Sequence, residues 1–159
     1  GASPLVDPKA AAQHVPQGRD RYQLAGEIAR GGMGVILRGF DTDLGRDVAV
    51  KVLPEGRFAS EASRYRFQRE IELAARLRHP NIVDIHDSGT VHNRPYCVME
   101  FIDGSRIDEW CDARRLPVAE RLRLFLAVCA ALHYAHGHLV VHLDDVIAVI
   151  VTVTAWGGV

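Results

Sequence analysis

The sequence predicts an α+β fold: a five-stranded antiparallel sheet with one helix, followed by further helices. Short segments rich in β-branched and aromatic residues alternate with turns over residues 21–53 and again over residues 82–102. Apolar residues recur at helical spacing over residues 60–77 and 117–136. This order of strands and helices is typical of an α+β fold.

The composition is that of a globular protein, because 48% of the 159 residues are hydrophobic and 25% are charged. This length is enough for one domain with a sizeable core. The net charge of −1 gives no argument for nucleic acid or an anionic membrane as a partner. No window holds 18 uninterrupted apolar residues and no apolar signal region opens the sequence. We therefore expect no membrane segment and a cytoplasmic location.

The cysteines and histidines show no metal-ligand spacing. Three cysteines are an odd number, which suits a reducing compartment better than a disulfide framework. We expect Cys97, Cys111 and Cys129 to be small core residues. Four histidines lie between residues 133 and 142, but no carboxylate or cysteine completes a familiar set of ligands. Metal binding there is conceivable and is not expected.

The first strands form a meander after a polar N-terminal segment. Residues 1–20 are rich in Ala, Pro and Gln without a sustained period, and we expect a flexible tail. Strands are predicted over residues 21–29 and 35–41, joined by a glycine turn. A second turn over residues 42–46 leads to an apolar strand, residues 47–53, that carries a lysine.

The glycine turn and the lysine are the features that suggest chemistry. Gly31, Gly32 and Gly34 give a backbone that can lie flat against a ligand, because no Cβ intervenes. Each glycine in a hairpin costs roughly 0.5–1 kcal/mol relative to alanine, and a phosphate-covering loop would explain that cost. Lys51 is a single cation in an apolar strand. Taken alone, the glycines fit an ordinary hairpin equally well.

Together, the turn and the strand resemble the glycine-rich loop and third strand of protein kinases. The family pattern is G-x-G-x-x-G-x-V followed by V-A-x-K. Here Ala29 stands at the first glycine, Ile36 stands at the valine, and residues 48–51 read Val-Ala-Val-Lys. The segment Gly-Gly-Met-Gly, residues 31–34, resembles the loop sequence of the bacterial serine/threonine class. The resemblance covers residues 21–142.

This resemblance implies a protein-kinase-like small lobe that binds ATP, followed by a partial helical lobe. Met99 is the implied gatekeeper behind the adenine, and backbone groups of Glu100 and Ile102 are implied to hydrogen-bond its edge. From composition alone, Met99 would be an ordinary core residue. The implied nucleotide-binding residues are Ile28, Ala29, Arg30, Gly31, Gly32, Met33, Gly34, Val35, Ile36, Ala49, Lys51, Met99, Glu100 and Ile102.

The predicted helix over residues 60–77 carries the implied partner of the lysine. Glu70 occupies the position of the αC glutamate in the resemblance and should pair with Lys51. Such a pair would direct the ammonium toward the α- and β-phosphates. From periodicity alone, Glu70 and Glu72 would be solvated carboxylates on an arginine-rich helix.

The remaining elements complete the sheet and begin the helical lobe. Strands are predicted over residues 82–88 and 95–101, and helices over residues 106–112 and 117–136. By the resemblance, the chain divides into a flexible tail at 1–20, an ATP-binding small lobe and hinge at 21–104, the first helices of the helical lobe at 105–142, and a divergent apolar tail at 143–159.

The match to the family fails in the catalytic loop. The family form is H-R-D-L-x-x-x-N, and His142-Leu143-Asp144 places Asp144 where the catalytic base belongs. Val149 stands at the position of the magnesium-binding asparagine, and no D-F-G follows in the sequence. The family implies Mg²⁺ as well as ATP, but two of the metal-holding residues are missing here.

The apolar tail suggests association. Residues 146–153 are nearly all Val, Ile or Ala, which is a strong strand composition. Residues 146–159 contain no charged side chain, so we expect an exposed apolar edge there. Together with the apolar face of the helix predicted over residues 117–136, this edge leads us to expect self-association.

The function implied by the resemblance is phosphoryl transfer from ATP to serine or threonine residues of proteins. Lys51 and Glu70 would position the phosphates, and Asp144 would accept the substrate proton. With two metal ligands missing, we expect little or no activity from this chain alone. Two alternatives remain: a pseudokinase-like module that binds a nucleotide or a partner without catalysis, and a nonfunctional fragment that self-associates.

Overall fold

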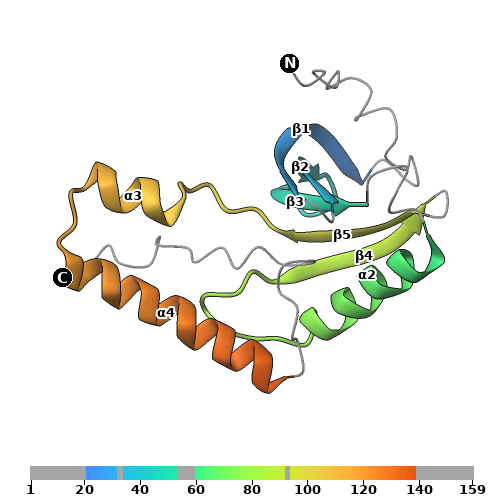
Figure 1. The fold of residues 1–159 in the computed structure, drawn as a ribbon. Helices are drawn as coiled ribbons and strands as arrows, with labels where there is room; N and C mark the ends of the chain where they lie inside the picture. Colours follow the sequence, from blue (N-terminus) through green and yellow to red (C-terminus); the bar gives the residue numbers. More distant parts are fainter. Residues whose placement is uncertain (1–20, 32–33, 54–59, 92–93, 139–159) are drawn as a thin grey trace, which may run out of the picture.

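The computed structural model describes residues 21–31, 34–53, 60–91 and 94–138 (Figure 1). The predicted flexible tail at 1–20 and the predicted apolar tail at 143–159 lie outside these ranges. In the described ranges, no helix combines the length and the apolar character needed to cross a bilayer.

Five antiparallel strands form one sheet with the spatial order β1-β2-β3-β5-β4. The strands are β1 (Tyr22–Gly31), β2 (Gly34–Asp41), β3 (Arg46–Val52), β4 (Ile85–Val91) and β5 (Arg94–Glu100). The helices are α2 (Glu61–Ala74), α3 (Ile107–Ala113) and α4 (Val118–Gly137). The predicted five-stranded antiparallel sheet with one helix between its strands is confirmed.

The apolar core lies between α2 and one face of the sheet. Phe67, Ile71 and Ala74 of α2 are buried in one cluster with side chains of β3 and β5, and with the small residues Ala131 and Ala135 of α4. On the other face, a second buried cluster contains Val48, Val50 and Val98. The strands β3 and β5 are therefore covered on both sides, which fixes the position of the lysine in β3.

Several predicted boundaries differ from the structure, most clearly those of one helix and one strand. The helix expected over 60–77 ends at Ala74, and the chain then turns while Leu77 stays buried. The strand expected over 82–88 begins at Ile85, although Ile82 and Val83 are buried in the preceding loop. Apolar periodicity reports which residues are buried, and here tertiary packing buries residues that belong to no regular element.

The helix α2 begins at a side-chain cap. The Ser60 hydroxyl accepts a hydrogen bond from the backbone N–H of Ser63, and so satisfies one of the free donors in the first turn. The cap places Phe67 and Ile71 toward the sheet. Figure 1 shows α2 running beneath β4 and β5, while α3 and α4 follow beyond the end of the sheet.

Candidate nucleotide-binding site

The backbone of the glycine hairpin at Gly34 packs against the methylene groups of the Lys51 side chain. A Cβ at Gly34 would be 2.9 Å from the carbonyl oxygen of Val52 and 3.3 Å from Cε of Lys51. Real Cβ atoms do not approach a backbone oxygen so closely, so this position requires glycine. Glycine lowers stability because it loses more backbone entropy on folding than other residues do. The close packing between β2 and β3 explains why glycine is nevertheless present here.

Lys51 is a buried cation, with only 6% of its surface exposed. In the sheet it lies between Ile36 of β2 and Cys97 of β5. Its Nζ is 6.0 Å from the centre of the Phe67 ring on α2, so the ammonium extends toward that helix. A buried ammonium must interact with an anion or with strong hydrogen-bond acceptors. A lysine in this position is therefore suited to binding an anionic group.

Cys97 is not that anion. The thiol is completely buried, and this burial raises its pKa to about 12, while the charge of Lys51 acts in the opposite direction. The thiol is therefore neutral at physiological pH. The place of Cys97 beside Lys51 was not anticipated from the sequence, although Cys97 is two residues before Met99 and so shares its face of β5.

Glu70 is on α2, one turn after Phe67 and directly before the buried Ile71. Residues three apart are neighbours on a helix surface, so Glu70 lies next to Phe67, the residue that Lys51 approaches. The glutamate is partly buried. The structure therefore brings the α2 turn that carries Glu70 to the side of the sheet from which Lys51 extends.

Apolar side chains lie next to Lys51 on the same face of the sheet. Met99 is buried and lies opposite Ala49 in the pairing of β3 with β5. Both belong to the cluster against which Ile36 and Ile102 pack. Four of the implied nucleotide-binding residues are thus brought together in one apolar cluster.

One backbone group of the predicted hinge already forms a hydrogen bond within the chain. The N–H of Glu100 donates a 3.0 Å hydrogen bond to the carbonyl oxygen of Asp84. A contact of Glu100 with an adenine would therefore use its carbonyl oxygen. Ile102 follows the end of β5 and is partly buried.

The β1 side of the hairpin is more open. Ile28 is about half exposed, and Ala29 and Arg30 lie opposite Ile36 and Val35 of β2. Arg30 forms a double hydrogen bond with Glu27 on the surface of the strand. Gly31 pairs with Gly34 at the end of the hairpin. The remaining predicted site residues, Gly32, Met33 and Asp144, lie outside the described residues.

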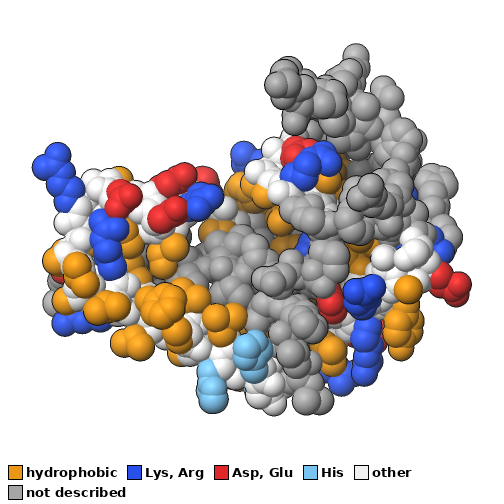
Figure 2. Space-filling view, in the orientation of Figure 1, with side chains coloured by type: hydrophobic (Ala, Val, Ile, Leu, Met, Phe, Trp, Pro, Cys, Tyr) orange, Lys and Arg blue, Asp and Glu red, His pale blue; other side chains and the backbone are white. Residues whose placement is uncertain are grey.

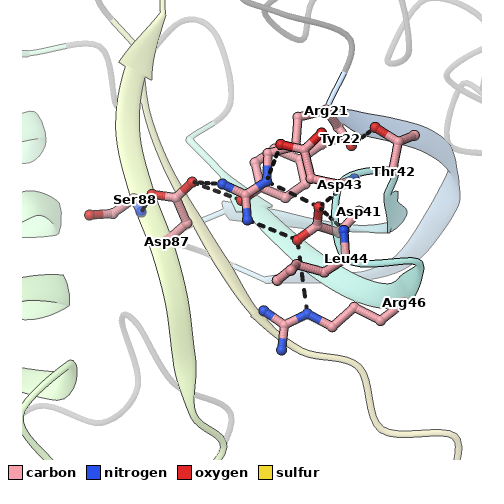
Figure 3. A network of polar contacts seen from close by, with 9 residues as sticks. All are labelled: Arg21, Tyr22, Asp41, Thr42, Asp43, Leu44, Arg46, Asp87 and Ser88. Carbon is pink, nitrogen blue, oxygen red and sulfur yellow. Dashed lines mark hydrogen bonds and ion pairs between the residues drawn. The ribbon is translucent and has the colours of Figure 1, made fainter.

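A polar network stabilises the opposite end of the hairpin (Figure 3). Asp41, at the end of β2, is completely buried and accepts hydrogen bonds from Nε and Nη2 of Arg21, each at 3.0 Å. The backbone N–H groups of Asp43 and Leu44 also donate to Oδ1 of Asp41. The hydrogen bonds from Arg21 hold the pKa of Asp41 below its usual value. The carboxylate is therefore charged although it is buried.

The same network joins the two edges of the sheet. Nη1 of Arg21 is 3.7 Å from Oδ2 of Asp87 on β4, and the Tyr22 hydroxyl donates to that oxygen at 2.7 Å. In the sheet, β1 and β4 are the two outer strands. Their side chains can meet only because the sheet curls strongly, as Figure 1 shows.

The described part of the chain contains no group of three or more His, Cys, Asp or Glu side chains arranged to hold a metal ion. Val149 stands at the position of the magnesium-binding asparagine of the family. A valine side chain cannot supply the oxygen ligand that the asparagine gives to Mg²⁺ in kinases.

Comparison with known proteins identifies the family. Residues 22–145 match the model of the protein kinase domain, and the chain belongs to this family. The arrangement of a curled five-stranded sheet with one helix is the small lobe of that domain, followed here by the first helices of the helical lobe.

The relatives are bacterial serine/threonine kinases. The chain is 40% identical over 128 residues to a probable serine/threonine-protein kinase PknB of Lactococcus lactis, and 36% identical over 135 residues to the PknB of Mycobacterium leprae. These matches cover 79% and 81% of this chain but 20% and 22% of the relatives. The chain thus spans about a fifth of the length of these curated relatives.

A solved structure shows the same fold. The kinase domain of PknI from Mycobacterium tuberculosis is 34% identical and superimposes with a TM-score of 0.60. The match covers 74% of this chain and 49% of that kinase domain. The predicted small-lobe fold and the bacterial serine/threonine type are confirmed.

Proposed function

We propose that this chain binds ATP between the glycine hairpin and the hinge. The packing of Gly34 on Lys51 carries the proposal, because it joins a phosphate-covering backbone to a buried ammonium. In this assignment Lys51 contacts the α- and β-phosphates, Glu70 holds the lysine in place, and Ala49 and Met99 line the adenine pocket. The site uses no residue outside the described part except Gly32 and Met33 of the loop.

The function of the whole protein, in this proposal, is the transfer of the γ-phosphoryl group of ATP to serine or threonine hydroxyls of a protein substrate. Asp144 would accept the proton of the hydroxyl while the new P–O bond forms. Mg²⁺, when bound in a kinase, neutralises charge on the phosphates. Because Val149 replaces the asparagine that holds Mg²⁺ in the family, we expect the chain to bind ATP and to transfer phosphate slowly or not at all.

A second candidate is a binding module without catalysis. It is favoured by Leu143 and Val149, which replace the arginine and the asparagine of the family's catalytic loop. The two candidates share the nucleotide site and differ only in chemistry. A cytoplasmic location, where ATP is available, is part of both.

Calorimetric titration with ATP tests the site. Saturable binding should weaken at least about tenfold in Lys51→Ala, because the phosphates lose a charge-assisted contact. The only other lysine of the chain provides a matched control, and Lys9→Ala should leave the affinity unchanged. A folded chain that does not bind ATP, or that binds it equally well without Lys51, contradicts the proposal. Titrations with and without Mg²⁺ then show whether the metal contributes.

Transfer of radiolabelled phosphate to a generic protein substrate separates the two candidates. Incorporation above background favours the enzyme, and incorporation that survives Asp144→Asn excludes Asp144 as the base. ATP binding without incorporation favours the binding module.

A further inference from the structure

The guanidinium of Arg38, on β2, covers the ring of Phe101 in the predicted hinge, directly after the end of β5. Cζ of Arg38 is 4.8 Å from the centre of that ring. Figure 2 shows basic and acidic side chains side by side over α3, and exposed ion pairs of this kind contribute little to stability. Arg38 differs because it also contacts an aromatic ring, and a cation over the face of a ring is attracted to it.

Arg38 lies on the same face of the sheet as the proposed nucleotide site. Successive residues of a strand point to opposite faces, so Arg38 shares its face with Ile36, two residues earlier on β2. In the sheet, Ile36 pairs with Lys51 and Arg38 pairs with Ala49. Directly paired residues project to the same side of a sheet, and so Arg38 lies beside the part of the site that is assigned to the adenine.

A carboxylate holds the arginine in this position. Nη2 of Arg38 donates a 3.2 Å hydrogen bond to Oδ2 of Asp47 on β3. Both side chains are about half exposed, so the pair by itself contributes little to stability. It does restrain the long side chain of Arg38, and this reduces the entropy that is lost when the guanidinium is placed over the ring.

Phe101 stands between the two hinge residues that are assigned to the adenine edge, Glu100 and Ile102. Its ring packs against the core cluster and is also covered by the Arg38 guanidinium. A side chain that is held in this way restrains the rotation of its own backbone, and with it the direction of the neighbouring peptide groups. Hydrogen-bonding groups that are fixed before binding lose less freedom when the ligand arrives, which raises affinity.

We propose that Arg38 is a positioning residue for the hinge, and that it acts through Phe101 on the backbone groups that receive the adenine. This role rests on the proposed nucleotide site. It concerns the base and not the phosphates, so the loss of Arg38 should affect every ligand that carries an adenine, whether or not the ligand carries phosphate.

Titration of the full chain with ATP, by calorimetry, and with adenosine, by ligand-detected NMR, tests the role. Arg38→Leu should weaken both ligands by the same factor, about two- to fivefold, because a cation–ring contact at an exposed site has this size. Arg38→Lys keeps a cation near the ring and should recover most of the affinity. Lys51→Ala should weaken ATP much more than adenosine, because adenosine has no phosphate.

Arg69→Leu is the matched control. The Arg69 side chain is exposed to a similar degree, 53% against 51% for Arg38, and it pairs with Glu72 at 3.1 Å. Its removal from α2 should leave the affinity for both ligands unchanged. Thermal melting of each variant shows whether the chain is folded, and the Arg38 variants should melt close to the unmodified chain.

A double substitution separates the contact from a general loss of stability. When Phe101→Leu is already present, Arg38→Leu should cause no further loss, because the effects of two residues in contact are not additive. Unchanged affinity in Arg38→Leu, a loss limited to ATP, or a further loss in the double variant overturns this role and leaves the ATP site standing. A folded chain that does not bind ATP overturns the site and the role together.

Discussion

Asp41 is completely buried at the end of β2, and each of its carboxylate oxygens accepts a hydrogen bond from Arg21 at 3.0 Å. The two residues are twenty positions apart in the sequence. A paired arginine and carboxylate in this double arrangement is among the strongest polar contacts in proteins. The pair closes the open end of the β1–β2 hairpin and so supports the glycine turn at its other end.

Removing Arg21 should destabilise the small lobe clearly. Arg21→Ala leaves the Asp41 carboxylate buried without its main partner, and we expect the melting midpoint to fall by several degrees. Arg69→Ala is the control, because Arg69 pairs with Glu72 on the solvent-exposed surface of α2. Surface pairs contribute little, so this midpoint should hardly change. Equal losses in the two variants would contradict the importance of the buried pair.

Stability should fall in acid because of Asp41. The pKa of this carboxyl is lower in the folded chain than in the unfolded chain, first because of the hydrogen bonds from Arg21. Its contribution is therefore fully present above the unfolded value of about 3.9 and is lost as the pH falls through the folded pKa. Urea unfolding between about pH 2 and 7 measures this. Asp41→Asn should be less stable at neutral pH and should lose less stability between pH 4 and 2; an unchanged acid slope would exclude Asp41 as the cause.

The close contact at Gly34 predicts a specific defect. Gly34→Ala places a methyl group 2.9 Å from the carbonyl oxygen of Val52, so the hairpin must move away from β3. We expect a loss of about 1–3 kcal/mol in the free energy of unfolding and weaker ATP binding. Gly26→Ala is the control in β1, because a Cβ there meets nothing within 4 Å. Denaturant unfolding and calorimetry on both variants check the result, and equal behaviour would contradict the contact.

The three cysteines should differ in reactivity. Cys97 and Cys111 are buried, and the thiol of Cys97 has a pKa raised to about 12, while Cys129 is partly exposed on α4. Because the thiolate is the reactive species, a disulfide reagent at pH near 8 should modify Cys129 first in the native chain and all three cysteines in denaturant. Mass spectrometry of digested protein locates the label. Labelling of Cys97 as fast as Cys129 would mean that β5 is not packed as described.

Much of the proposed nucleotide site could be predicted from the sequence because its signals are local. The hairpin glycines and Lys51 follow from short-range spacing, and strand alternation places Ala49 on the same face of β3 as Lys51. The match of this spacing to the kinase pattern gave the family, which the comparisons confirm. The residues around Lys51 could be predicted less well from the sequence, because Cys97 lies opposite Lys51 only through the pairing of β3 with β5.

The sequence by itself determined the elements and their approximate bounds, and it indicated the residues that we propose to carry the chemistry, because propensity, periodicity and motif spacing act over short stretches of chain. Tertiary structure alone decided three further features. It curled the sheet so that Arg21 and Asp87, on opposite edges, come together. It ended α2 at Ala74 while keeping Leu77 buried. It turned the alanines of α4 inward and left Leu122 and Phe125 outside, because long-range packing, not local pattern, selects which apolar face of a helix is covered.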